Sequence, residues 1–262
     1  MDLTLYQLDA FTDRVFGGNP AAVCPLSEWL PDETLQAIAI ENNLSETAFY
    51  IPQGEDYHLR WFTPGEEVDF CGHATLATAA LILMRLEPER DQVRFHTRVG
   101  MLDIAREGDL LVMDFPVQPA GPIDEEETAA LVAALGLRPL ECFGGTRDYL
   151  AVLPDEAAVR DFVPDSAKLV GLKRQATIIT APGQEVDFVS RVFAPYFGIP
   201  EDPVTGSSHC TLAPYWSKRL GKTEMTARQI SRRGGSLVCI DKGERIVLKG
   251  KAAFYMEGRI SL

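Results

Sequence analysis

"VDFCGHATLATAALILM", residues 68 to 84, decides the fold, because a thiol, a glycine and an imidazole stand directly before an apolar run. From Ala74 to Met84 the run carries no charge, which is typical of a helix that other elements surround on all sides. Its length is about half of the roughly 20 residues that a membrane span requires. The stretch therefore predicts a central core helix whose amino end carries Cys71, Gly72 and His73.

The same arrangement occurs a second time in the chain. Residues 60–64 (RWFTP) and 191–195 (RVFAP) share the pattern R-x-F-[TA]-P at a displacement of 131 residues, which is half of the 262 in the chain. After each copy an acidic residue leads to a glycine that begins a helix, and the second of these helices is expected from Ser207 to Leu220. The matches predict an internal duplication.

Strand patterns outnumber helix patterns along the chain. Further helices are expected at Asp32 to Asn42, with Asp32 as the N-cap, and at Glu125 to Leu135, ended by Gly136. Strands are expected at residues 4–11, 47–51, 58–62, 92–96, 110–115, 149–153, 176–180, 186–193 and 245–249. This pattern predicts an α+β fold in which each half wraps strands around one central helix.

The two halves are expected at residues 1–115 and 116–262, and the last strand is free to return to the first half. No Gly/Ser/Pro linker is long enough to separate them widely. A seam near Pro116 to Pro122 is therefore expected to leave a cleft between the halves.

Composition excludes several classes of protein. The formal charge is −13, from 38 acidic and 25 basic residues, and this argues against a nucleic-acid surface. The opening MDLTLYQLDAFTDR lacks the basic start and apolar core of a signal peptide, so a cytoplasmic protein is expected. With no membrane-length run, membrane binding is not expected either.

Cysteine and histidine spacing speaks against a disulfide framework or a structural metal site. The five cysteines form no C-x-x-C pair, and the four histidines form no H-x-x-x-H pattern. We therefore expect neither a disulfide framework nor a metal.

The two helix starts are candidate anion sites. Unpaired N–H groups at Gly72 and His73, and at Gly206 and Ser207, suit a carboxylate, and two such starts facing one cleft would hold an acidic small molecule. The plainer reading is that each glycine closes a turn and that Ser207 is an N-cap.

Four further side chains are open to two interpretations each. His73 is either a satisfied cap or a proton-transfer group, and Cys71 is either a reactive thiol or a small buried hydrophobe. Glu46, in the stretch NLSETAF, is either a solvated acid or a carboxyl acid/base. The FGGNP turn either reverses the chain or brings the Asn19 amide to a ligand.

The stretches FTDRVFGGNPAAV, NNLSETAF, RWFTP, DFCGHATLA, EDPVTGSSH and RRGGSL, in this order, resemble the phenazine-biosynthesis isomerase family. The resemblance covers nearly the whole chain. It implies the diaminopimelate-epimerase-like fold, with two pseudo-symmetric halves, each a barrel-like, mostly antiparallel sheet around a helix. It also implies a homodimer and proton transfer without a cofactor.

The resemblance assigns roles to particular residues. Glu46 corresponds to the glutamate that moves a proton between carbons of dihydro-hydroxyanthranilate, a small carboxylated metabolite. His73 matches the histidine of the G-H-x-T motif, and Asp202 and Ser207 match the aspartate and serine of D-P-x-T-G-S. His73 and Asp202 are thus expected to act beside Glu46, with Asn19, Cys71, Gly72, Thr205, Gly206 and Ser207 as binding residues.

Related epimerases place a cysteine before the glycine in both halves, whereas this chain has Cys71 in the first half and Thr205 in the second. A two-thiol racemase is therefore disfavoured. Two alternatives to the Glu46 isomerase remain. One is a single-base epimerase or dehydratase that uses Cys71, and the other is a metabolite-binding protein of the same fold without turnover.

Overall fold

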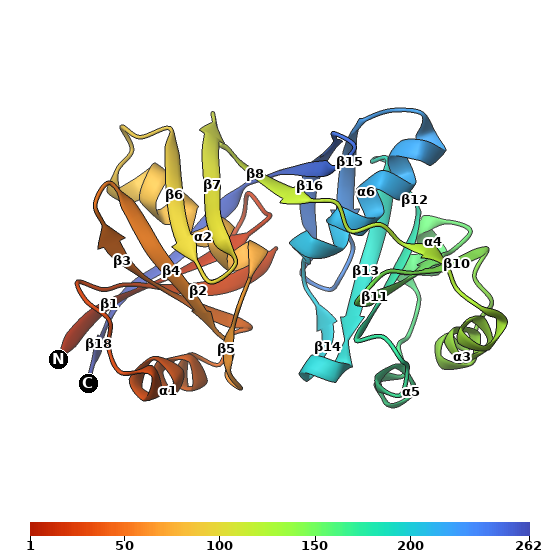
Figure 1. Cartoon of the computed structure of the whole chain (residues 1–262), viewed down its shortest axis with the longest axis horizontal. Coiled ribbons are helices and arrows are strands. Elements are labelled where there is room, and N and C mark those ends of the chain that lie inside the picture. The colour runs from red at the N-terminus through yellow and green to blue at the C-terminus, as the bar shows by residue number, and fades with distance from the viewer. The chain divides into compact units, whose positions relative to one another are not determined.

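The computed structural model describes the whole chain, Met1–Leu262, as two compact units. The first unit comprises Met1–Asp114 together with Lys249–Leu262, and the second comprises Phe115–Leu248. Figure 1 shows that each unit is mostly sheet with few helices. The C-terminal residues Lys249–Leu262 thus belong with the N-terminal part of the chain.

In the first unit, nine strands and two α-helices enclose a core. The strands β2 and β3 are parallel, β3 and β4 form an antiparallel hairpin, and β4 and β6 are parallel again. The elements are β1 Asp2–Ala10, β2 Asn19–Pro25, α1 Asp32–Asn42, β3 Glu46–Gln53, β4 Asp56–Phe62, β5 Glu67–Val68, α2 Gly72–Leu81, the π-turn η1 Ile82–Leu86, β6 Gln92–Thr97, β7 Gly100–Glu107, β8 Leu110–Pro116 and β18 Ala252–Ser261.

The second unit repeats this order of pairings. The strands β11 and β12 are parallel, β12 and β13 form an antiparallel hairpin, and β13 and β15 are parallel. Its elements are β9 Gly121–Pro122, α3 Glu125–Leu135, β10 Glu141–Gly144, β11 Asp148–Val152, α4 Glu156–Arg160, α5 Ser166–Val170, β12 Ala176–Pro182, β13 Phe188–Ala194, the 3-10 turn η2 Pro195–Phe197, β14 Ile199–Asp202, α6 Gly206–Leu220, β15 Glu224–Gln229, β16 Gly235–Asp241 and β17 Arg245–Gly250. The internal duplication read from RWFTP and RVFAP is thus present in the strand topology.

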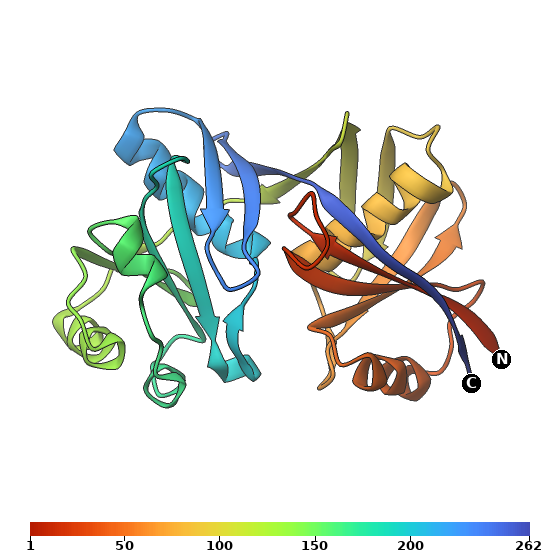
Figure 2. The same ribbon diagram turned by 180° about the vertical axis from the view of Figure 1, so that it is seen from behind.

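The helix α2 is the central core helix that the sequence predicts. Every residue from His73 to Leu81 is buried, and the helix packs against β1, β2, β3 and β18. Figure 2 shows β1 and β18 running across it. The expected end at Met84 needs a correction, because regular helix stops at Leu81 and a π-turn follows, in which the Glu87 N–H donates to the Ile82 carbonyl at 2.7 Å.

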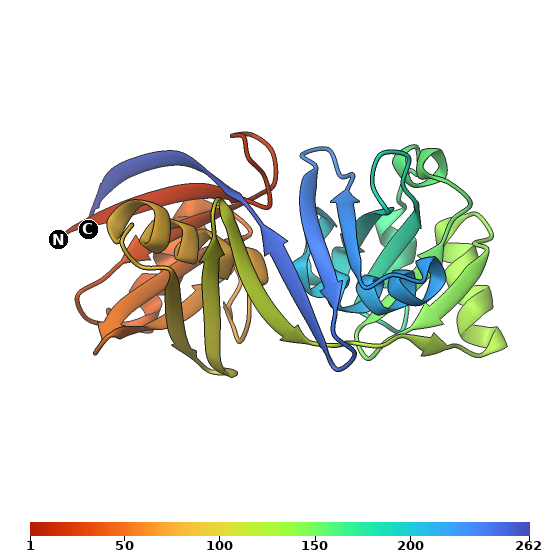
Figure 3. The ribbon, with the colours of Figure 1, turned by 90° about the horizontal axis from the view of Figure 1, so that it is seen from above.

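The two chain ends lie together in the first unit, where β1 pairs antiparallel with β18 and the Leu262 N–H donates to the Met1 carbonyl at 2.8 Å. Figure 3 shows the two strands side by side. None of the helices combines the length and apolarity needed to span a membrane.

Two expected N-caps are wrong. Pro31 precedes α1, so Asp32 is the first helical residue, and its carboxylate accepts from Arg60 at 2.8 Å instead of capping the helix. Likewise α6 begins at Gly206 with Thr205 as its N-cap, which places Ser207 inside the first turn. Gly136 does end α3, in the left-handed conformation with φ 67°.

The arginine of the repeated motif has the same partner in both units. Arg60 bridges both oxygens of Glu67, with each distance 2.7 Å, and Arg191 bridges both oxygens of Glu201 at 2.7 and 3.0 Å. In each unit the acid belongs to the short strand that leads to the central helix. The motif therefore fixes the segment that positions the amino end of that helix.

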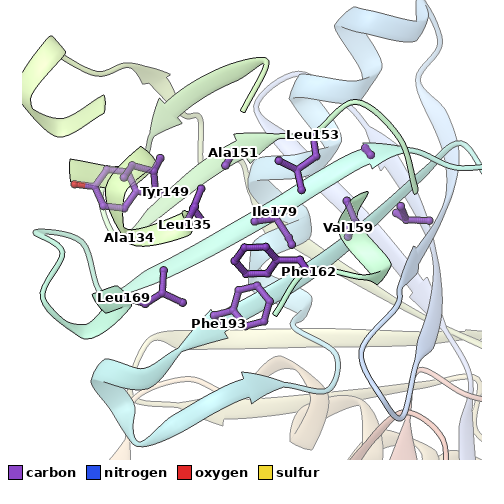
Figure 4. Packing of buried hydrophobic residues seen from close by; sticks show 13 residues of the cluster. Ala134, Leu135, Tyr149, Ala151, Leu153, Val159, Phe162, Leu169, Ile179 and Phe193 are labelled. Atoms are coloured by element: carbon purple, nitrogen blue, oxygen red, sulfur yellow. The ribbon is translucent and has the colours of Figure 1, made fainter. Parts of the chain in front are cut away.

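One hydrophobic cluster of the second unit is built from α3, the short helices and the strands β11 to β13. Figure 4 shows Phe162 and Phe193 meeting below Ile179, with Leu135 and Tyr149 to one side. The ring centroids of Phe162 and Phe193 are 5.4 Å apart. This packing surrounds the base of Arg191, whose guanidinium lies over the Phe193 ring.

His209 in α6 predicts a measurable pH dependence of stability. Burial lowers its pKa to about 4, and its Nδ1 donates to the Thr205 carbonyl at 2.8 Å. An unfolded histidine takes up a proton near its ordinary pKa of 6.5, so the folded state loses stability as pH falls from 6.5 to 4, by at most about 1.4 kcal/mol per pH unit.

The matched variant is His209→Thr, since Thr75 at the corresponding place in α2 makes the same bond, to the Cys71 carbonyl at 2.6 Å. Urea unfolding at several pH values should show a shallower loss for the variant across this window. Equal slopes for the two proteins would contradict the assignment.

Candidate active site

The amino end of α2 has no side-chain cap. Cys71 is its N-cap in extended conformation and no side chain caps the helix, so the first N–H groups face outward from a helix that is otherwise buried. The Thr75 hydroxyl donates to the Cys71 carbonyl and holds this turn. An anion placed here would meet both these N–H groups and the positive end of the helix dipole.

Glu46 and His73 meet at this helix end. Glu46 is the first residue of β3, where it lies opposite Ala21 of the parallel strand β2. Its Oε2 is 3.1 Å from His73 Nε2, and the two side chains are 14% and 7% exposed. Although the two atoms are close, neither one has a hydrogen-bond partner, so the contact does not have the geometry of a hydrogen bond. Glu46 Oε2 is thus a buried carboxyl oxygen without a hydrogen-bond partner.

Asn19 and Cys71 approach the other ring nitrogen. Asn19 Nδ2 is 3.2 Å from His73 Nδ1, and Cys71 Sγ is 3.5 Å from the same atom. Gly18 brings Asn19 here, because its φ is +59° and a Cβ would lie 2.1 Å from the Ala10 carbonyl oxygen. The FGGNP turn therefore serves the site through its shape, and Asn19 holds His73 directly.

The electrostatics of the cluster favour a neutral thiol beside a proton-bearing imidazole. Burial, with the charge of Glu46 added, raises the pKa of Cys71. Burial by itself lowers the pKa of His73, but the contacts with Cys71 and Glu46 outweigh it and raise that pKa well above its ordinary value. Cys71 raises the pKa of His73 through its charge only when it is a thiolate. While the thiol is protonated, the Glu46 carboxylate is the charge that raises the pKa of His73.

In the second unit, the start of α6 has a different set of side chains. The Thr205 hydroxyl donates to Asp202 Oδ2, and the Thr205 N–H donates to Oε1 of the buried Gln229 at 2.9 Å. Ser207 Oγ accepts from Arg147 at 3.0 Å, while Arg147 also bridges both oxygens of the buried Asp148 at 2.7 and 2.9 Å. These hydrogen bonds hold polar side chains of both charges, those of Asp202, Arg147 and Asp148, close to the start of α6.

The second unit has no counterpart of Glu46. In the first unit, Glu46 precedes Thr47, which pairs with Phe62 of the repeated motif. In the second, Ala176 precedes Thr177, which pairs with the motif's Phe193. Ala176 therefore occupies the position of Glu46, and only the first unit supplies a carboxyl at that place.

The structure brings most predicted residues together within their own units. Asn19, Glu46, Cys71 and His73 gather at Gly72, while Asp202, Thr205 and Ser207 gather at Gly206. Sequence reasoning missed Arg147, Asp148 and Gln229. A charged Arg-Asp pair at the head of the apolar strand β11 is the signal that could have found the first two.

Comparison with known proteins gives consistent matches along the full chain. The profile of the family described as phenazine biosynthesis-like protein matches residues 8–258. An uncharacterized isomerase of Pseudomonas aeruginosa is 53% identical over 262 residues, with 100% of each chain covered. A crystal structure of a PhzF-family phenazine biosynthesis protein from Enterococcus faecalis matches with a TM-score of 0.94 and 44% identity, again over 100% of each chain.

A more distant structure shares the fold. A predicted epimerase from Pseudomonas aeruginosa matches with a TM-score of 0.76 at 19% identity and covers 99% of each chain. At this identity the match bears on fold alone. The mixed α+β architecture is the diaminopimelate-epimerase-like fold that the sequence predicts.

Proposed function

The chain belongs to the phenazine biosynthesis-like family, and from this premise we propose that it isomerises a small carboxylated substrate with Glu46 as the acid/base. The comparisons support an isomerase-type enzyme. The observation that carries the finer proposal is the Glu46–His73 contact at the start of α2, in which the carboxyl oxygen Oε2 has no hydrogen-bond partner.

In the proposed reaction, Glu46 takes a proton from a carbon that a neighbouring unsaturated group acidifies. The electron pair of that C–H bond moves into the conjugated system, and the new carboxylic acid returns the proton to a carbon further along. The proton count is unchanged, so neither a cofactor nor an oxidant is needed. The substrate's carboxylate would accept N–H groups at the start of α2, and the His73 N–H would stabilise developing negative charge.

The second unit is given a binding role. Gly206 and Ser207 are proposed to hold an anionic or hydroxyl substituent of the substrate. Asp202, which the Thr205 hydroxyl orients, is proposed to hold a polar substituent. Because Ala176 stands where the first unit has Glu46, the proposal assigns both the removal and the return of the proton to the Glu46 carboxyl.

The proposal is tested by NMR of the purified protein in D₂O with trans-2,3-dihydro-3-hydroxyanthranilate, followed by a panel of other small carboxylates. Isomerisation, or deuterium uptake at carbon in one of them, would support the proposal and identify the substrate class. If the protein binds one or more of these compounds but catalyses no deuterium exchange in any of them, the result would favour the non-catalytic alternative.

Cys71→Ala separates Glu46 from the single-thiol alternative. Burial raises the pKa of the thiol, so Cys71 is a poor base at neutral pH. We expect the variant to keep its rate of proton transfer within about tenfold, whereas loss of a true general base costs about 10²–10⁴-fold. The rate is measured by deuterium exchange, and a loss above a hundredfold in a folded variant would favour the alternative that uses Cys71.

A further inference from the structure

The site holds three different metal-ligating groups at one point. Glu46, Cys71 and His73 each offer one ligand atom, and these atoms all lie within 4.8 Å of one another. Cys71 and His73 are buried, and the Glu46 side chain is 14% exposed. Thiolate, imidazole and carboxylate are the ligands that zinc takes in proteins.

The spacing of two of the three ligand atoms is close to that around a tetrahedral zinc ion. Zinc ligand atoms at 2.0–2.3 Å from the metal lie about 3.3–3.7 Å from each other. His73 Nε2 is 3.1 Å from Glu46 Oε2, and the ligand atoms of all three residues lie within 4.8 Å of one another. Cys71 Sγ contacts Nδ1 of the same ring at 3.5 Å, so the thiol has to move toward Nε2 for the sulfur, that nitrogen and the carboxyl oxygen to share a centre.

The hydrogen bonding identifies the nitrogen. His73 Nε2 and Glu46 Oε2 are buried, adjacent and without hydrogen-bond partners. Nδ1 instead faces the Asn19 amide at 3.2 Å. After a half-turn of that amide, its carbonyl accepts a proton from Nδ1, and Nε2 then presents a lone pair, the usual arrangement of a metal-bound histidine.

We propose that Glu46, Cys71 and His73 form a reversible Zn²⁺ site, with the fourth position open to water, and that the bound metal inhibits the enzyme. Binding exchanges the Cys71 thiol proton and one proton of the charged His73 imidazole for the metal, so two protons are released and two negative ligands balance the two charges of zinc. The metal occupies the carboxyl oxygen and removes it from proton transfer. The inhibitory half of this inference rests on the proposed function, while the metal site does not.

Binding is tested with Co²⁺ added to the metal-free, full-length protein, because a thiolate-to-cobalt absorption band reports coordination by sulfur. We expect one Co²⁺ per chain, displaced by Zn²⁺, with binding weaker at low pH because the thiol has to lose its proton. Cys71→Ser and His73→Ala should each weaken binding by more than about 100-fold, because losing even an outer-shell partner of a metal ligand costs about 10–100-fold.

The control is Cys142→Ser, since Cys142 is a partly exposed thiol in β10 of the other unit. Its cobalt spectrum should match that of the wild type. Absence of a thiolate-to-cobalt band in the wild type would overturn the site. So would a band that disappears in Cys142→Ser but persists in Cys71→Ser.

Activity supplies the second readout. Zn²⁺ should stop deuterium exchange, and EDTA should restore it. If the protein exchanges no substrate, the cobalt titration still decides the metal site. If exchange proceeds and cobalt leaves Cys71 unbound, the zinc inference fails and the Glu46 reaction stands.

Discussion

Glu46→Gln is expected to lower the turnover rate at least 10²–10⁴-fold, the usual contribution of a general acid/base, while substrate binding persists. Glutamine keeps the shape of the side chain and its place opposite Ala21 in the sheet, but its amide cannot take a proton from carbon. The Oε2 atom that lies 3.1 Å from His73 is the one that loses this capacity.

Two readouts separate chemistry from folding in this variant. Calorimetric titration should give an affinity close to that of the wild type, and urea unfolding should give a similar midpoint. Glu66→Gln, in an exposed turn of the same unit, is the matched control and should keep full activity. Near-normal turnover by Glu46→Gln would remove Glu46 from its role.

Arg191→Met is expected to destabilise the second unit by about 3–5 kcal/mol, the cost of breaking a buried ion pair from one side. Arg191 is 8% exposed, and besides Glu201 it donates through Nη1 to the carbonyls of Val159, Arg160 and Phe162, the shortest distance being 2.6 Å. Methionine fills the space but leaves the Glu201 charge and three carbonyls without their donor.

The unfolding free energy in urea measures the effect, and hydrogen exchange in β13 assigns it to the second unit. Arg228→Met is the control, because the Arg228–Glu185 pair is exposed, and such a pair contributes at most about 1 kcal/mol. Equal losses for the two variants would show that the repeated arginine does not stabilise the segment before α6.

The sequence predicts the fold most reliably where burial and local pattern agree. The uncharged run after His73 lies in a helix buried throughout, and the strands around RWFTP and RVFAP repeat in the two units. Strands that local signals oppose were missed. β2 holds Pro20 and Pro25 and looks like a turn, and β18 places consecutive exposed residues at 255–257 and pairs with the distant β1.

The candidate site was predictable in its residue types but not in its contacts. Glu46 and His73 are 27 positions apart, and only the parallel pairing of β2 and β3 with α2 behind them brings the carboxyl to the imidazole. Asn19 was expected to bind a ligand, and its contact with His73 was not predicted. Arg147 escaped notice because its link to Ser207 spans 60 residues, a contact that no local pattern encodes.

The central claim, that Glu46 is the residue that moves the proton, is tested most directly by one NMR measurement. The rate of deuterium incorporation at substrate carbon in D₂O is compared for the wild type, Glu46→Gln and Cys71→Ala. We predict exchange by the wild type and by Cys71→Ala, and exchange slowed by about 10²–10⁴-fold or more in Glu46→Gln. Exchange that survives in Glu46→Gln and disappears in Cys71→Ala would contradict the claim and make the thiol the base.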